Sequence, residues 1–230
     1  MAFAIQLAFD LREVDEIIEI VSNLPSPVDT ATLRLLQRLH GGEEHPDDDK
    51  AGHARESQYE LYLGSVLRRA GINAKHGEPD LAAMWREKVY HLEAKRPSSA
   101  DRVDDRLRSA VRQLRLLSEP GIVALCLDQV VRPANKLLLA PTLDAVAPEV
   151  NDLITKYVAQ NTSMWKRRLP AEPVDAILFT ARVPARLMST GHLVLGSNLH
   201  IEVLARARTG TSAEFIQAAA AAYMAAQGPP

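Results

Sequence analysis

The sequence predicts an α/β protein in which a central mixed β-sheet is flanked by helices. The first observation behind this class is that runs with helical spacing alternate with short strand-like runs across residues 54–130. The second is size and composition, since the 230 residues are 47% hydrophobic and 24% charged. A chain of this kind can bury one good-sized core, with or without a small appendage.

A small helical appendage is expected over residues 1–50. Its first helix begins at Asp10, a fair N-cap, and its apolar residues have helical spacing: Leu11, Val14, Ile17, Ile18 and Val21. A second helix covers residues 29–40 and has one apolar face, formed by Leu33, Leu36 and Leu39. Residues 43–50 are too charged to pack, so we expect an exposed linker before a main domain at residues 51–230.

The main domain begins with a dense series of elements. A helix over residues 54–70 presents a broad apolar stripe and is ended by Gly71. It is followed by strands at 72–76, 80–85 and 89–95, a helix at 101–117 and a buried strand at 122–127. Further on we expect a strand at 136–140, a helix at 148–160, strands at 175–182 and 192–204, and a last helix at 212–227.

Composition excludes several classes of protein. No apolar run reaches eighteen residues, so no membrane span is expected. The N-terminus lacks the basic region of a signal peptide, which favours a cytoplasmic protein. Cys126 is the only cysteine and lies in an apolar run, so neither an intrachain disulfide nor a cysteine-built zinc site can form, and a buried core thiol is expected.

The net charge of −2 is unevenly distributed. Residues 1–53 hold four basic and eleven acidic residues, a balance of −7, whereas the rest hold twenty-three and eighteen, a balance of +5. A mildly basic body is compatible with a nucleic-acid partner but does not require one. The acidic first segment is unsuited to direct DNA contact, and it could instead serve as a homodimer arm or dock a protein partner.

The strand at residues 89–95 carries the first candidate functional residues. Side chains alternate between the two faces of a strand. One face is therefore expected to meet a core through Tyr90, Leu92 and Ala94. The other face holds His91, Glu93 and Lys95, which places a carboxylate and an ammonium side by side. A solvent-exposed sheet face with ordinary mixed charges is the alternative interpretation.

The residues around Glu93-Ala94-Lys95 make this segment a stronger functional candidate than the pattern alone. The same acid-x-Lys pattern occurs by chance at Asp48-Asp49-Lys50, so the pattern alone is not specific. Asp80, however, begins the strand before residues 89–95, and a hairpin of these strands would bring Asp80 towards Glu93. The helix before them carries Glu56 and Glu60, one turn apart on one face.

Four segments together resemble the PD-(D/E)xK nuclease superfamily: Tyr59-Glu60-Leu61-Tyr62, Leu67-Arg68-Arg69-Ala70-Gly71, Pro79-Asp80 and Leu92-Glu93-Ala94-Lys95-Arg96-Pro97. The superfamily includes restriction enzymes, Holliday-junction resolvases and RecB-like nucleases. The resemblance covers residues 54–130, about a third of the chain. It implies a restriction-endonuclease-like core of αβββαβ order and a reaction class, but no particular enzyme.

The resemblance also implies a magnesium site, in which Mn²⁺ is expected to substitute. Asp80 and Glu93 would ligate the metal, and the Ala94 carbonyl could supply another oxygen. Glu60 would complete the shell, directly or through water, with Glu56 in reserve. These residue types suit the chemistry independently, because Mg²⁺ prefers hard oxygen ligands and retains waters.

Lys95 is implied to orient and activate the attacking water, and Gln113 loosely matches a polar residue on the following helix. The expected function is therefore a metal-dependent nuclease that hydrolyses phosphodiester bonds, with DNA the preferred substrate. Two alternatives stay open. One is an RNA-cutting toxin or defence effector of the same fold, and the other is a non-catalytic nucleic-acid-binding or scaffold protein.

A basic helix face is a candidate for contact with the substrate. Arg108, Arg112 and Arg115 recur at helical spacing after the acid set and could follow a phosphate backbone. A solvated helix face explains them equally well, because acidic residues lie in the same segment. His91, near Glu93, is a further candidate for substrate contact.

Overall fold

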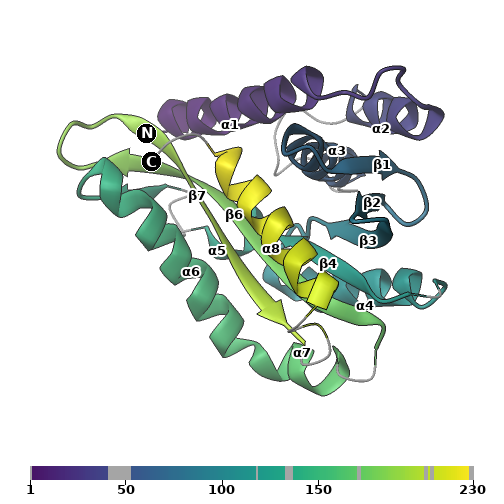
Figure 1. The fold of residues 1–230 in the computed structure, drawn as a ribbon. Helices are drawn as coiled ribbons and strands as arrows, with labels where there is room; N and C mark the ends of the chain where they lie inside the picture. Colours follow the sequence, from purple (N-terminus) through teal and green to yellow (C-terminus); the bar gives the residue numbers. More distant parts are fainter. Residues whose placement is uncertain are drawn as a thin grey trace.

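A mixed sheet of seven strands forms the centre of the protein (Figure 1). The computed structural model describes residues 2–40, 53–117, 119–132, 137–169, 172–204, 207 and 210–227. Its strands are β1 (Asn73–His76), β2 (Leu81–Trp85), β3 (Lys88–Lys95), β4 (Gly121–Cys126), β5 (Leu138–Ala140), β6 (Val174–Leu187) and β7 (Leu193–Val203). The spatial order is β1-β2-β3-β4-β6-β5, and β7 pairs with β6. The first three strands are antiparallel, whereas β3, β4 and β6 run parallel, so the sheet is mixed, as predicted.

Helices cover both faces of this sheet. They are α1 (Ala2–Ser22), α2 (Thr30–His40), α3 (His53–Arg69), α4 (Val103–Leu114), α5 (Asp128–Val131), α6 (Val146–Gln160), α7 (Thr162–Arg168) and α8 (Gly210–Ala225). One hydrophobic core lies between the sheet and α3 and α8, and a second lies between the sheet and α4, α6 and α7. Alternate side chains of β4 and β6 enter the two cores, which is why these central strands are apolar on both faces.

The predicted order of helix, three strands, helix and strand is observed as α3, β1, β2, β3, α4 and β4. Gly71 ends α3 in the left-handed region, with φ of 78°, and Ile72 donates its N–H to the Leu67 carbonyl. Arg86 and Glu87 form the two-residue turn between β2 and β3, also with positive φ. This turn geometry suits the twist of a hairpin and fixes its register.

Two predictions about the first helices were wrong. α1 begins at Ala2, so Asp10 lies inside the helix and is not its N-cap. No glycine or proline interrupts the residues before Asp10, and the helix continues through them. In α2 the buried leucine is Leu35, which is 5% exposed, whereas Leu33 is 49% exposed. Asp29 is the N-cap of this helix, and its Oδ1 accepts the Thr32 N–H at 2.7 Å.

α1 is joined to the main body by buried ion pairs. Arg12 is fully buried and donates from Nη1 to Asp128 Oδ2 at 3.1 Å. Glu16 accepts from Gln58 of α3 at 2.6 Å. Residues 43–50, the predicted acidic linker, lie outside the described residues. Within the described ranges, none of the helices combines the length and the apolar character needed to cross a membrane.

Candidate metal and catalytic site

The β2–β3 hairpin brings the two predicted metal-binding acids together. Leu81 pairs with Leu92 in this antiparallel hairpin, so the next residues, Asp80 and Glu93, lie opposite each other on its two arms. The Asp80 Oδ2 atom accepts the backbone N–H of Ala94 at 2.9 Å. The carboxylate of Asp80 is thus fixed against the end of β3.

Lys95 completes this arrangement. Its Nζ atom lies 2.8 Å from Asp80 Oδ2 and 2.8 Å from Glu93 Oε2. Burial alone would lower the pKa of Lys95, but the charges of Asp80 and Glu93 outweigh it and the pKa is raised. The ammonium therefore stays charged between two carboxylates. Three residues proposed from sequence meet at one point.

The two faces of β3 are both covered. Tyr90, Leu92 and Ala94 belong to the core beneath α3 and α8, as the alternation predicts. On the other face Glu93 is 0% exposed and Lys95 is 6% exposed. The alternative of a solvent-exposed charged face is therefore wrong for these two residues.

Glu60 of α3 faces the same cluster. Burial, followed by the negative charge of Asp80, raises the pKa of Glu60 to about 9. Burial and Asp80 likewise raise the pKa of Glu93 to about 7. Carboxyl groups with such shifts share a site in which negative charge exceeds what the one lysine neutralises. A bound cation would relieve this excess.

Glu56, the reserve ligand, lies at the edge of the cluster. Its carboxylate is 3.6 Å from Arg106 of α4. Burial still raises the pKa of Glu56, and the Arg106 charge opposes this shift. Of the two helix glutamates, Glu60 has the larger pKa shift and is the better candidate for a shared metal shell.

The residues present fit a hard divalent cation. Glu93 Oε1 and Glu56 Oε1 are buried without a hydrogen-bond partner. The N–H and C=O groups of one strand residue point to the same side, so the Ala94 carbonyl lies on the side of β3 on which Asp80 accepts the Ala94 N–H. Oxygen donors of this kind are those that Mg²⁺ prefers. No three His, Cys, Asp or Glu side chains among the described residues are grouped in metal-binding geometry, so a shell here would need the carbonyl and waters.

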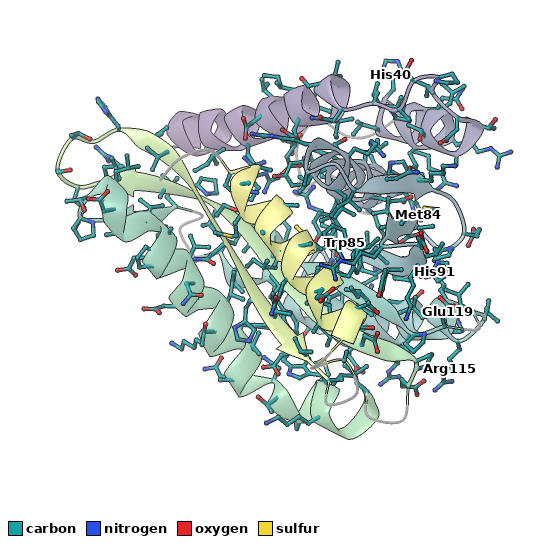
Figure 2. All side chains as sticks on the ribbon, in the orientation of Figure 1. His40, Met84, Trp85, His91, Arg115 and Glu119 are labelled. Carbon is teal, nitrogen blue, oxygen red and sulfur yellow. The ribbon has the colours of Figure 1, made fainter. Side chains whose placement is uncertain are left out.

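His91 and Gln113 lie towards the other end of β3. His91 is half-buried and stands two residues before Glu93 (Figure 2). Gln113 is next to Leu114, whose side chain packs at Gly121, beside the His91 carbonyl. Arg106, also on α4, lies 3.6 Å from the carboxylate of Glu56.

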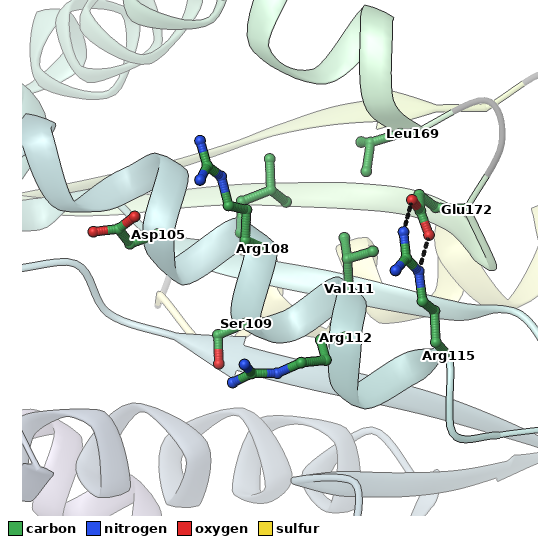
Figure 3. Close-up of a pocket in the computed structure, with 9 residues that line it drawn as sticks. Asp105, Arg108, Ser109, Val111, Arg112, Arg115, Leu169 and Glu172 are labelled. Atoms are coloured by element: carbon green, nitrogen blue, oxygen red, sulfur yellow. Dashed lines mark hydrogen bonds and ion pairs between the residues drawn. The ribbon is translucent and has the colours of Figure 1, made fainter.

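The three predicted arginines line one surface pocket of about 500 Å³ (Figure 3). Arg115 forms two hydrogen bonds with Glu172, and Arg108 pairs with Asp104 one turn away. Arg112 lies beside Ser109 on the side of α4 turned away from Glu172. Among the described residues Arg112 has no ion-pair partner, so it is the arginine of this set with an uncommitted charge.

Two residues near the site were missed by the sequence analysis. His76 of β1 is buried, and its Nδ1 lies 3.6 Å from Glu60 Oε1. Burial, followed by the charge of Arg68, lowers the pKa of His76 to about 4. Arg106 is the second residue. The sequence did contain an indirect signal for His76. Gly64 lies inside α3, one turn after Glu60, and a glycine within a helix can mark a place where another group packs closely.

Glu60→Gln should flatten the pH dependence of stability in the metal-free protein. The folded-state pKa of Glu60, about 9, lies above the ordinary value of 4.5, so folding favours the protonated form. The stability that this proton contributes is present below pH 4.5 and is lost as pH rises towards 9, by up to about 1.4 kcal/mol per pH unit. Glutamine does not ionise, so the free energy of unfolding of the variant, relative to that of the wild type, should increase between pH 5 and pH 9.

Urea unfolding with a chelator at three pH values measures this effect. The exposed Glu149 of α6 provides a matched control, since Glu149→Gln should leave the curve parallel to that of the wild type. A Glu60→Gln curve parallel to the wild type would show that Glu60 ionises normally.

Comparison of the chain with known proteins finds no family model that matches it and no similar curated protein.

Proposed function

We propose that the protein is a metal-dependent nuclease that hydrolyses phosphodiester bonds, most directly in DNA. The observation that carries this proposal is the meeting of Asp80, Glu93 and Lys95 at the end of the β2–β3 hairpin. Several buried carboxyl groups, including Glu60, surround one lysine, and a divalent cation would balance their negative charge.

The order of elements around the site supports a restriction-endonuclease-like core. α3 carries Glu60, Asp80 precedes β2, and β3 carries Glu93 and Lys95. β4 then pairs parallel to β3 after the crossover through α4. The position of each acid within these elements agrees with the PD-(D/E)xK pattern from which the nuclease activity was inferred.

Asp80, Glu93 and the Ala94 carbonyl would hold Mg²⁺, with Glu60 adding a ligand directly or through water. When bound, the cation supplies charge neutralisation for the phosphodiester and a water of lowered pKa. Lys95 would leave its two carboxylates and point its ammonium at the attacking water and the scissile phosphate. A cation at that position stabilises charge that develops in the transition state.

A cleavage assay tests the proposal most directly. Labelled single-stranded DNA, duplex DNA and RNA would be incubated with Mg²⁺, with Mn²⁺ and with a chelator. We expect metal-dependent cleavage of DNA. Cleavage of RNA alone would favour the toxin or effector alternative. Binding without cleavage of any of the three substrates would refute the nuclease and favour a binding module.

Arg112→Ala should weaken nucleic-acid binding more than Arg108→Ala does. The Arg112 charge is uncommitted, whereas Arg108 is already paired with Asp104. Loss of one phosphate contact should lower the slope of log affinity against log salt by about one. Affinities at several salt concentrations, measured with catalytically silent protein in chelator, give this slope. An unchanged slope in Arg112→Ala would identify the arginine face as merely solvated.

A further inference from the structure

An unusual glycine marks a second layer behind the acid cluster. Gly64 lies in the middle of α3, where glycine costs about 1 kcal/mol relative to alanine. A Cβ at this position would lie 2.7 Å from both Cε1 and Nε2 of the His76 ring. The glycine therefore leaves the space in which the ring of His76 lies.

The ring occupies a defined place along one face of α3. Glu60, Gly64 and Arg68 follow one another at intervals of four residues, so they share that face. His76 lies across Gly64, with Nδ1 3.6 Å from Glu60 Oε1 and Nε2 3.4 Å from Arg68 Nη1. The side chain of His76 is 0% exposed, so both ring nitrogens are shielded from bulk solvent.

Arg68 determines which nitrogen of the ring carries the proton. A guanidinium has donors and no acceptor, so His76 Nε2 must accept. The ring is then neutral with its proton on Nδ1, the nitrogen that faces Glu60. Arg68 itself is held in place, because it also donates to the carbonyls of Asn23 at 2.7 Å and Ala74 at 3.2 Å.

We infer that His76 is a positioning residue for Glu60, with its Nδ1–H directed at the Glu60 carboxylate and its tautomer set by Arg68. This inference rests on the proposed metal site and adds an orienting contact to it. The separation of 3.6 Å is longer than a hydrogen bond. Such contacts commonly shorten when the site is assembled. Carboxylates that bind metals are held by outer hydrogen bonds of this kind, whose loss typically costs about 10–100-fold in affinity.

Four variants test the inference by Mn²⁺ binding, measured calorimetrically without substrate. His76→Leu should weaken Mn²⁺ affinity about 10–100-fold. His76→Gln should restore most of it, because the amide can accept from Arg68 and donate to Glu60. Gly64→Ala should weaken affinity with every polar group retained, because the added methyl displaces the ring. Gly77→Ala is the matched control, since a Cβ there meets nothing within 4 Å.

The outcomes separate the inference from the nuclease proposal. Wild-type affinity in folded His76→Leu overturns the inference, and so does equal loss in the leucine and glutamine variants, which indicates packing alone. Metal binding without cleavage refutes the nuclease and leaves the role of His76 to be decided by the same titrations. Absence of Mn²⁺ binding by the wild type overturns both.

Discussion

Lys95→Ala should lower the rate of phosphodiester cleavage about 100- to 1000-fold, which is the usual effect of removing one group that stabilises transition-state charge. Metal affinity should be equal to or greater than that of the wild type, because Nζ lies 2.8 Å from both carboxylates and competes with a cation for them. From the alternation of side chains along β3 alone, Lys95→Ala would be expected to cost little stability, because Leu92 and Ala94 do the packing. The buried ion pairs change this expectation. Without Lys95 and without a metal, two negative carboxylates would lie close together, so the variant should be less stable than the wild type.

Single-turnover cleavage and Mn²⁺ titration together measure these effects. Asp80→Ala gives the contrast, because it should lose activity through weaker metal binding, and high Mn²⁺ should restore part of it. The same Mn²⁺ should not restore Lys95→Ala. Cleavage by folded Lys95→Ala at the wild-type rate would remove lysine from the mechanism.

Asp128→Ala should destabilise the protein by about 3–5 kcal/mol, the usual cost of removing one partner from a buried ion pair. Asp128 Oδ2 accepts from Arg12 and Arg96 at 3.1 Å each, and Oδ1 accepts the Arg182 N–H at 2.8 Å. Burial alone would raise the pKa of Asp128, but Arg12 and Arg96 outweigh it and the pKa is lowered. Asp128 thus binds two buried arginines at once, and Glu16 lies 3.8 Å from each of them.

Urea unfolding measures the loss, with the exposed Asp144→Ala as the matched control within about 0.5 kcal/mol of the wild type. If Asp128→Ala does not fold, Asp128→Asn keeps the size of the side chain and removes only the charge. A cost below about 1 kcal/mol in either variant would mean that the arginines find other partners or water.

The hairpin was the most predictable part of the molecule. Strand periodicity and the short interval between Asp80 and Glu93, which are thirteen positions apart, are local features, and a short hairpin leaves few ways to arrange them. Glu60 was expected because the resemblance to the PD-(D/E)xK superfamily implies a metal-binding acid on this helix, which the apolar pattern predicts. Local sequence information therefore covered the element order from α3 to β4 and three members of the acid cluster with their lysine.

Contacts between distant segments were not predictable in the same way. His76 meets Glu60 because β1 lies along α3, and nothing in the spacing of these two residues shows it. The spacing of apolar residues in α2 predicts Leu33 on the apolar face, but Leu35 is buried and Leu33 is exposed. The packing of α2 against its neighbours decides which leucine is buried. The pairing of Arg12 with Asp128 spans 116 residues and has no sequence signature.

The bonds that hold α1 also bear on how the chain is made. The side chain of Arg182 donates to Asp15 across 167 residues. A ribosome that adds about 5–20 residues per second needs roughly 10–30 s to cover that interval. During this interval α1 can already pair with Gln58 of α3, only 42 residues from Glu16, whereas Arg182 of β6 has not yet been made. α1 therefore acquires its partners in two stages, first α3 and much later Asp128 and Arg182, and a nascent-chain chaperone would have its opportunity between the two.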